Sequence, residues 1–152
     1  MKILRRISIL LLFSLFCVLA LTAQEDTELS PQVSAFLEAF DRVDDVGKLE
    51  VVQTTIDEPV ADLESFYTTV IDYVTNNNSE VFVNTNIREM AMLSFPRIIE
   101  GGFSSMNIQL WTLFNEIDET FWRIEVLGVM EAVGYGDAQL AVNLSDWVDG
   151  QN

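Results

Sequence analysis

The sequence predicts an all-α protein built as a short α-solenoid, with about three helical hairpins behind an N-terminal capping helix. Three observations lead to this prediction. Apolar residues recur at helical spacing almost everywhere from Ser30 onward, signals for helix starts and stops follow at short intervals, and similar helix pairs recur every 35 to 40 residues. Residues 80–83 alternate like a strand, but that stretch is too short to pair alone.

Residues 1–23 are typical of a secretory signal peptide. An apolar stretch, residues 7–21, follows three basic residues, and the small Ala23 precedes the expected cleavage point. An uncleaved membrane anchor is the alternative, but the apolar stretch is shorter than the roughly 20 residues that a spanning helix needs. Lipid attachment at Cys17 is disfavoured because the bulky Phe16 precedes it. We therefore expect an exported protein, periplasmic or secreted, with no membrane attachment after cleavage.

The chain is strongly acidic. It has 8 Lys and Arg residues, 24 Asp and Glu residues and no His, for a net charge of −16, and loss of the three basic residues of the leader changes this to −19. Binding to nucleic acid or to anionic lipid requires basic residues, so we exclude both partners. With no His and with Cys17 as the single Cys, zinc sites, Ser–His–Asp or Cys–His catalysis and disulfides are excluded too. We expect no cofactor and no catalytic residue.

The predicted domain, residues 31–152, follows an acidic linker at residues 24–30. Ser30 fits an N-cap, and Pro31 fits the first position of a helix. The apolar stripe of that helix is Val33, Phe36, Leu37 and Phe40. We expect a second helix at residues 46–56, and a third from residue 59 to an Asn-rich turn at residues 76–79.

Caps and glycines mark the later helices. Asn86 and Glu89 form a capping-box pattern for a helix that Gly101 and Gly102 close. The three remaining helices are expected to open at Ser104, Asp118 and Asp137, and the middle one is closed by Gly134 and Gly136. Short loops then join seven helices.

The helix pairs repeat along the chain. Arg123 lies 35 residues after Arg88, and Arg88 lies 40 residues after Lys48. Apolar positions coincide at both offsets, and Gly101 falls on Gly136 at the first. One amphipathic pair cannot bury both of its apolar sides, whereas three stacked pairs share a continuous core. The first helix then covers the first pair as a cap.

Residues 118–134, DETFWRIEVLGVMEAVG, resemble the first helix of a HEAT repeat of the short type also found in phycobilisome lyases. Trp122 and Arg123 stand for the apolar–Arg pair of such units, and residues 86–88 repeat the theme. The resemblance implies a short right-handed α-solenoid and carries no catalytic residues. Its structural repeat positions in this chain are Arg88, Asp118, Arg123, Gly134 and Asp137.

Two acidic clusters invite a functional interpretation. Asp41, Asp44 and Asp45 suggest a calcium loop, but Val46 stands where such a loop requires Gly, so a solvated turn is favoured. The second cluster consists of Glu116, Asp118 and Glu119. It precedes a predicted helix, so a favourable interaction with the helix dipole explains it.

Arginines and tryptophans have structural interpretations. Arg88 and Arg123 occupy equivalent repeat positions, so we expect each to bridge to an acid or a loop carbonyl of the neighbouring repeat. The three tryptophans are Trp111, Trp122 and Trp147. They would form an aromatic site only if they converged, and we expect them to pack in the core instead.

The inner face of the solenoid is the remaining candidate for binding. In HEAT-like stacks the second helix of each pair lines the concave side. The polar residues expected there are Thr68, Asp72, Asn107, Trp111, Asn143 and Asp146. This acidic to neutral face suits a basic or polar protein segment. The alternative is that these are ordinary solvated helix faces.

Three functions remain open at this point. The first is an exported HEAT-like module for protein–protein interaction, without catalytic activity, whose partner is a protein of the cell envelope. The second is a lyase-like protein that handles a chromophore or ligand through carboxylates and Tyr67, Tyr73 or Tyr135. The third is a fragment of a longer solenoid.

Overall fold

The computed structural model describes residues 29–81 and 83–134, together with residues 142 and 147. Within that part of the chain the protein is all-α, as the sequence predicts, and it contains no β-strand. The α-helices are α2 (Pro31–Arg42), α3 (Asp45–Thr54), α4 (Glu64–Asn76), α5 (Thr85–Gly101), α6 (Asn107–Glu116) and α7 (Thr120–Val133). Short 3-10 turns lie between them: η1 (Val60–Asp62), η2 (Asn78–Glu80) and η3 (Ser104–Met106).

Several predictions concern residues outside this part of the chain. The leader at residues 1–23 and most of the linker at residues 24–30 lie outside the described residues. So does the helix predicted to open at Asp137, apart from Val142 and Trp147, which are both helical. None of the described helices combines the length and the apolar character that a membrane crossing requires.

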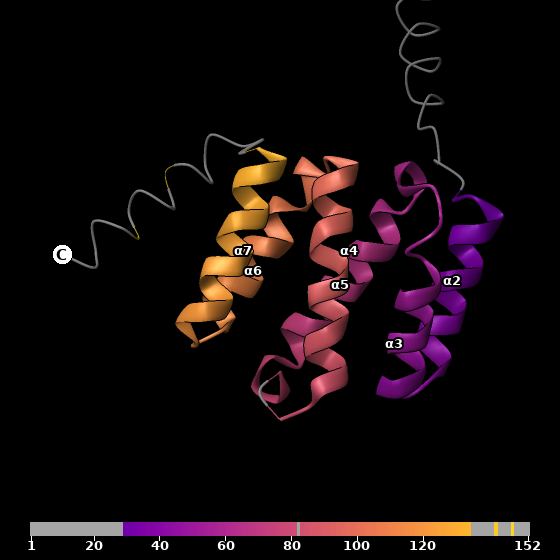
Figure 1. Ribbon diagram of the computed structural model, residues 1–152, viewed down its shortest axis with the longest axis horizontal. Helices are drawn as coiled ribbons and strands as arrows, with labels where there is room; N and C mark the ends of the chain where they lie inside the picture. The colour runs from indigo at the N-terminus through magenta and orange to yellow at the C-terminus, as the bar shows by residue number, and fades with distance from the viewer. Residues whose placement is uncertain (1–28, 82, 135–141, 143–146, 148–152) are drawn as a thin grey trace, which may run out of the picture.

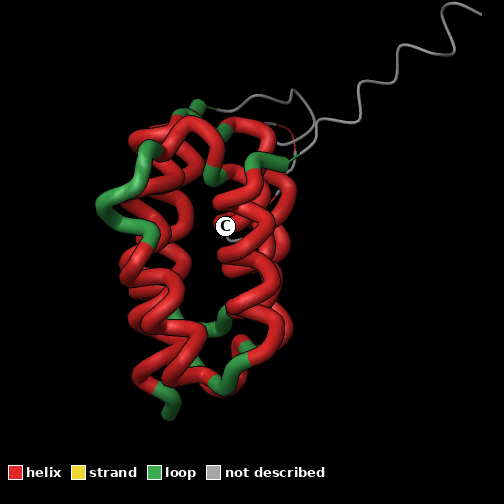
Figure 2. The backbone as a smooth tube through the Cα atoms, turned by 90° about the vertical axis from the view of Figure 1, so that its right-hand side faces the viewer, coloured by secondary structure: helices red, strands yellow, loops and turns green. Residues whose placement is uncertain are grey.

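The six helices form a row of pairs in two layers. In Figure 1 the pairs α2/α3, α4/α5 and α6/α7 follow one another across the molecule, and Figure 2 looks along the row at the two layers. One layer holds α3, α5 and α7, because α5 contacts both of the others; the second holds α2, α4 and α6, because α4 contacts both of the others. These contacts among the described helices are compatible with a short solenoid or a small bundle.

The pairing by contact is offset from the sequence repeat. Extensive contacts across the layers join α2 to α3, α4 to α5 and α6 to α7. The repeat instead groups residues 46–56 with residues 59–74, which are the segments of α3 and α4. Two residues connect α2 to α3 and three connect α6 to α7, and such short connections hold consecutive helices side by side. The expected cap, α2, contacts both α3 and α4, so it covers the first repeat pair and also forms a hairpin with α3.

Side-chain caps start three of the helices. The Ser30 hydroxyl accepts a hydrogen bond from the Val33 amide (3.2 Å), as predicted for α2. Asp44 caps α3 by accepting from the Gly47 amide (3.1 Å). The prediction that Asn86 caps α5 is wrong, because Asn84 is the N-cap and its side-chain oxygen accepts from the Asn86 amide (3.1 Å).

Glycines end two helices in the way the sequence predicts. Gly102 follows α5 with φ = 64°, the left-handed region that glycine adopts without strain. Gly134 follows α7 with φ = 84°. Pro96 lies inside α5, which continues as a single helix on both sides of it.

The core lies between the two layers. Phe66 and Tyr67 of α4 are fully buried, and the Phe66 ring packs edge-on against Phe40 of α2 with ring centroids 5.9 Å apart. Not every residue of the predicted apolar stripes is buried. Ile56 and Ile99, which helical spacing assigns to the core, are 37% and 40% exposed. Ile56 lies beyond the end of α3, and Ile99 lies on α5 beside residues of α7.

Candidate functional site

The predicted inner face maps onto α4 and α6. On α4, Thr68 is half-buried and donates to the backbone carbonyl of Glu64 (2.9 Å), and Asp72 is exposed. Partial burial raises the pKa of the Asp72 carboxyl. On α6, the half-buried Trp111 stacks on Phe114 with ring centroids 5.3 Å apart. Thr68, Asp72 and Trp111 therefore remain accessible in part.

Asn107 does not belong to an exposed face. It is 2% exposed, and its side-chain amide donates to the backbone carbonyl of Gly134 (2.6 Å). The residue thereby ties the first turn of α6 to the end of α7, so its expected place on a solvated inner face is corrected to a buried structural contact. Asn143 and Asp146, the other two residues expected on the inner face, lie outside the described residues, as does Asp137.

Cations at two of the three equivalent repeat positions reach a backbone carbonyl in the preceding segment. The Lys48 ammonium donates to the carbonyls of Phe40 (2.5 Å) and Val43 (2.9 Å), and the Arg123 Nε donates to the carbonyl of Ile117 (2.6 Å). In each case the accepting carbonyl lies at or just after the carboxyl end of the preceding helix. The residue therefore neutralises the negative end of a helix dipole.

Arg88 departs from this pattern. The residue is exposed, and within the described residues its side chain makes neither a hydrogen bond nor an ion pair; its backbone amide donates to the carbonyl of Asn84 (3.3 Å). Asp118, the acid predicted near Arg123, lies 4.0 Å from that guanidinium with its side chain fully exposed, so the pair contributes little to stability. Glu116 and Glu119 are exposed as well.

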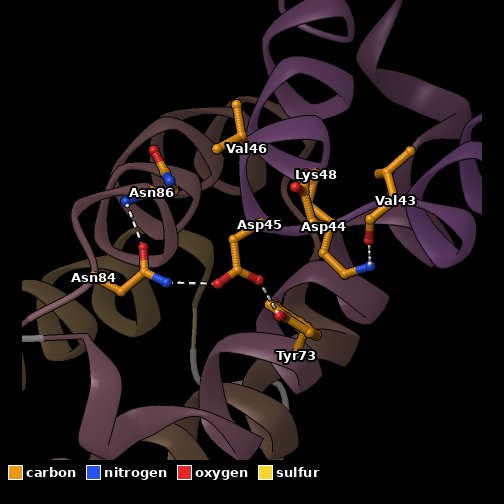
Figure 3. Close-up of a pocket in the computed structure, with 8 residues that line it drawn as sticks. All are labelled: Val43, Asp44, Asp45, Val46, Lys48, Tyr73, Asn84 and Asn86. Carbon is orange, nitrogen blue, oxygen red and sulfur yellow. Dashed lines mark hydrogen bonds between the residues drawn. The ribbon is translucent and has the colours of Figure 1, made fainter.

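A polar depression lies at the amino end of α3, where the sequence places its first acidic cluster (Figure 3). The residues that line it are Val43, Asp44, Asp45, Val46, Lys48, Tyr73, Asn84 and Asn86. The Asp45 carboxylate is its centre: Tyr73 of α4 donates its hydroxyl hydrogen to one oxygen, and the Asn84 amide donates to the other (2.5 Å). Asp45 therefore links α3 to α4 and to the start of α5.

This arrangement limits the chemistry of Tyr73. Burial, the hydrogen bond to Asp45 and the charges of Asp45 and Glu80 raise the pKa of the Tyr73 phenol to about 12. A phenol with so high a pKa is a poor proton donor near neutral pH. Both oxygens of the Asp45 carboxylate already accept hydrogen bonds. Within the described residues no three His, Cys, Asp or Glu side chains converge in a way that could hold a metal ion.

Two of the three tryptophans pack against the same phenylalanine, and the third lies elsewhere. Trp111 and Trp147 both pack against Phe114, the second edge-on with ring centroids 5.1 Å apart. Trp122 is 2% exposed and packs instead against Phe95, with ring centroids 6.3 Å apart. These contacts belong to the core and its margin.

An apolar groove runs between α5 and α7 on the outer side of their layer. We call it the α5–α7 groove, and its apolar lining consists of Met92, Phe95, Pro96 and Ile99 of α5 and of Phe121, Trp122, Ile124, Gly128 and Val129 of α7. It consists of two depressions that adjoin at Met92, which lines both. Phe121 and Ile124 are 55% and 61% exposed.

Sequence reasoning missed this groove because it placed one apolar stripe on each helix. On α7, the helical spacing that selects the buried Trp122, Val126 and Met130 as the core stripe leaves out Phe121 and Ile124. The sequence does contain a signal for it: α7 carries apolar residues on more than one face, which is typical of a helix that packs against two partners.

Comparison with known proteins adds no relative: no protein family model, no curated protein and no solved structure matches this chain.

Proposed function

We propose that this protein is an exported module for protein–protein interaction, of the HEAT-like kind, without catalytic activity. Its partner is a protein of the cell envelope. The observation that carries the proposal is the α5–α7 groove, because contiguous exposed apolar surface on a soluble domain marks an interaction site. The row of helix pairs supports it, since such rows present long surfaces to partners.

The chemistry of the polar residues favours this proposal over a lyase-like or ligand-handling protein. Of the tyrosines that such an activity would use, Tyr67 is fully buried beside Thr55 (hydroxyl oxygens 3.0 Å apart), and Tyr73 has a pKa of about 12. Tyr135 lies outside the described residues. The sequence also lacks His, the usual proton-transfer residue.

Two measurements test the proposal. The first is chemical cross-linking in cells that export the protein, followed by its purification from envelope and culture fractions. We expect a protein partner in constant ratio to the chain. Recovery of the monomer alone would contradict the proposal, and a copurifying compound that absorbs above the tryptophan band would favour the ligand-handling alternative.

The second measurement is the intact mass of the exported chain. We expect a mature protein that begins at Gln24, because Ala23 is the small residue before the expected cleavage point. A chain retained in the cytoplasm with residues 1–23 attached would contradict export.

A further inference from the structure

The α5–α7 groove has the form of a seat for a helix. On α5 its lining residues follow helical spacing from Thr85 through Met92 to Ile99, and the two walls are the neighbouring helices of one layer. At 1.5 Å per residue the groove is about 21 Å long, which matches an α-helix of about four turns. Amphipathic helices bind such grooves through apolar residues at positions i, i+3, i+4 and i+7.

Gly128 indicates that the occupant approaches closely. It lies in the middle of α7 and lines the groove, and a Cβ added there would meet no atom of the described chain within 4 Å. Packing within the protein therefore gives no reason for a glycine, although glycine lowers helix stability relative to alanine. A missing side chain at this point lets the backbone of a second helix come near α7, which is a recurrent use of glycine.

The charges beside the groove select the occupant. Glu89 and Glu125 line it, Arg88 lies at one end, and Glu131 follows Gly128 by one turn on α7. The whole chain carries a charge of −16. A second copy of this chain would bring like charges together, whereas lysines or arginines beside the apolar face of a partner helix would meet carboxylates.

We infer that the α5–α7 groove binds an amphipathic helix of a partner protein, with an apolar face seated over Ile124 and Gly128 and basic residues along its flanks. This inference rests on the proposed function and specifies the chemistry of the partner. Desolvation of the exposed Phe121 and Ile124 supplies the affinity, and the carboxylates at Glu89 and Glu125 set the orientation.

The probe is a synthetic peptide of about 15 residues, with leucines at helical spacing and lysines on the flanking positions. A scrambled peptide of the same composition controls for attraction between net charges, and an analogue with glutamate in place of lysine tests the flanks. Isothermal titration calorimetry at 0.15 M NaCl measures each affinity for the exported chain. We expect the amphipathic basic peptide to bind at least tenfold more tightly than either control peptide.

Three variants locate the binding surface. Ile124→Ser removes an exposed apolar side chain from the groove, and we expect at least a tenfold loss of affinity. Ile108→Ser is the matched control, because Ile108 is 68% exposed on α6 in the other layer, and its affinity should stay within twofold. Gly128→Ala should raise the melting temperature of the free protein and still weaken binding severalfold, a combination that a structural defect would not produce.

Several results would overturn the inference: equal binding of the scrambled peptide, no binding of any peptide, or unchanged affinity in Ile124→Ser or Gly128→Ala. Self-association that Ile124→Ser abolishes would assign the groove to a second copy, and binding to phosphatidylcholine vesicles that this variant abolishes would assign it to a membrane. If a partner is cross-linked in cells while no peptide binds, the proposed function stands and the inference fails.

Discussion

Replacing Lys48 by methionine should destabilise the protein far more than removing another cation of the same hairpin. The Lys48 side chain is 8% exposed, and its ammonium donates to the carbonyls of Phe40 and Val43 at 2.5 and 2.9 Å. The ammonium also lies 4.7 Å from the centre of the Phe40 ring and 5.1 Å from that of the Tyr73 ring. Methionine keeps most of the aliphatic stem and removes the charge and the donors.

The magnitude follows from these contacts. A hydrogen bond to a charged group contributes about 1.5–3 kcal/mol, and a cation over an aromatic ring about 0.5–2 kcal/mol. Water can reach part of the turn after α2 and replace some of the lost donors, so we expect a net loss of about 2–4 kcal/mol in the free energy of unfolding. For a domain of this size that corresponds to a fall of roughly 10–20 °C in melting temperature.

Arg42→Met is the matched control for Lys48→Met. Arg42 pairs with Glu38 one turn away, but both side chains are largely exposed, at 73% and 59%. Such a pair contributes under about 1 kcal/mol, and the two substitutions change the net charge equally. Urea unfolding followed by circular dichroism at 222 nm gives both free energies. If Lys48→Met costs no more than Arg42→Met, the assigned role of the buried ammonium is wrong.

Three further predictions concern pH, helix propensity and salt. Folding raises the pKa of the Tyr73 phenol from 10.0 to about 12, so the contribution of this group to stability is complete below pH 10 and is lost as the pH rises from about 10 to about 12. The fall in melting temperature over this pH range should therefore be smaller in Tyr73→Phe than in the unmodified protein, and an equal fall would refute this. Gly128→Ala should stabilise the free protein by about 0.5–1 kcal/mol in urea unfolding, because the added methyl group meets no atom of the described chain; a loss of stability would indicate an unrecognised contact. Raising NaCl from low concentration to about 0.15 M, where the screening length is about 8 Å, should raise the melting temperature by weakening repulsion within a chain of charge −16; a constant or falling value would contradict this.

Helix class and several helix ends could be predicted because they depend on local interactions. Ser30 accepts its hydrogen bond from a residue three positions away, and Gly102 adopts its positive φ within the turn itself. The sequence alone does not decide the cap of α5, because Asn84 and Asn86 are both suitable caps. The choice depends on a contact distant in sequence, in which the Asn84 amide donates to Asp45 while its oxygen caps the helix.

The candidate surfaces were harder to predict because they depend on which helix faces are covered. Asn107 has the spacing of a solvated residue, yet it is buried, and its side-chain amide donates a hydrogen bond to the carbonyl of Gly134 just after α7. Ile99 has the spacing of a core residue, yet it lines the outer side of its layer. Helical periodicity reports that a face is apolar, but the number of layers decides whether that face is buried.

The proposed complex explains why several residues at the α5–α7 groove lower the stability of the free chain. Phe121 and Ile124 expose apolar surface, Gly128 weakens the helix that carries them, and Glu89 and Glu125 add negative charge to an already acidic protein. A basic amphipathic helix would cover the apolar side chains, occupy the space above Gly128 and neutralise the two carboxylates. Selection for stability alone would favour alanine at position 128, because the added Cβ would meet no neighbouring element of the described chain.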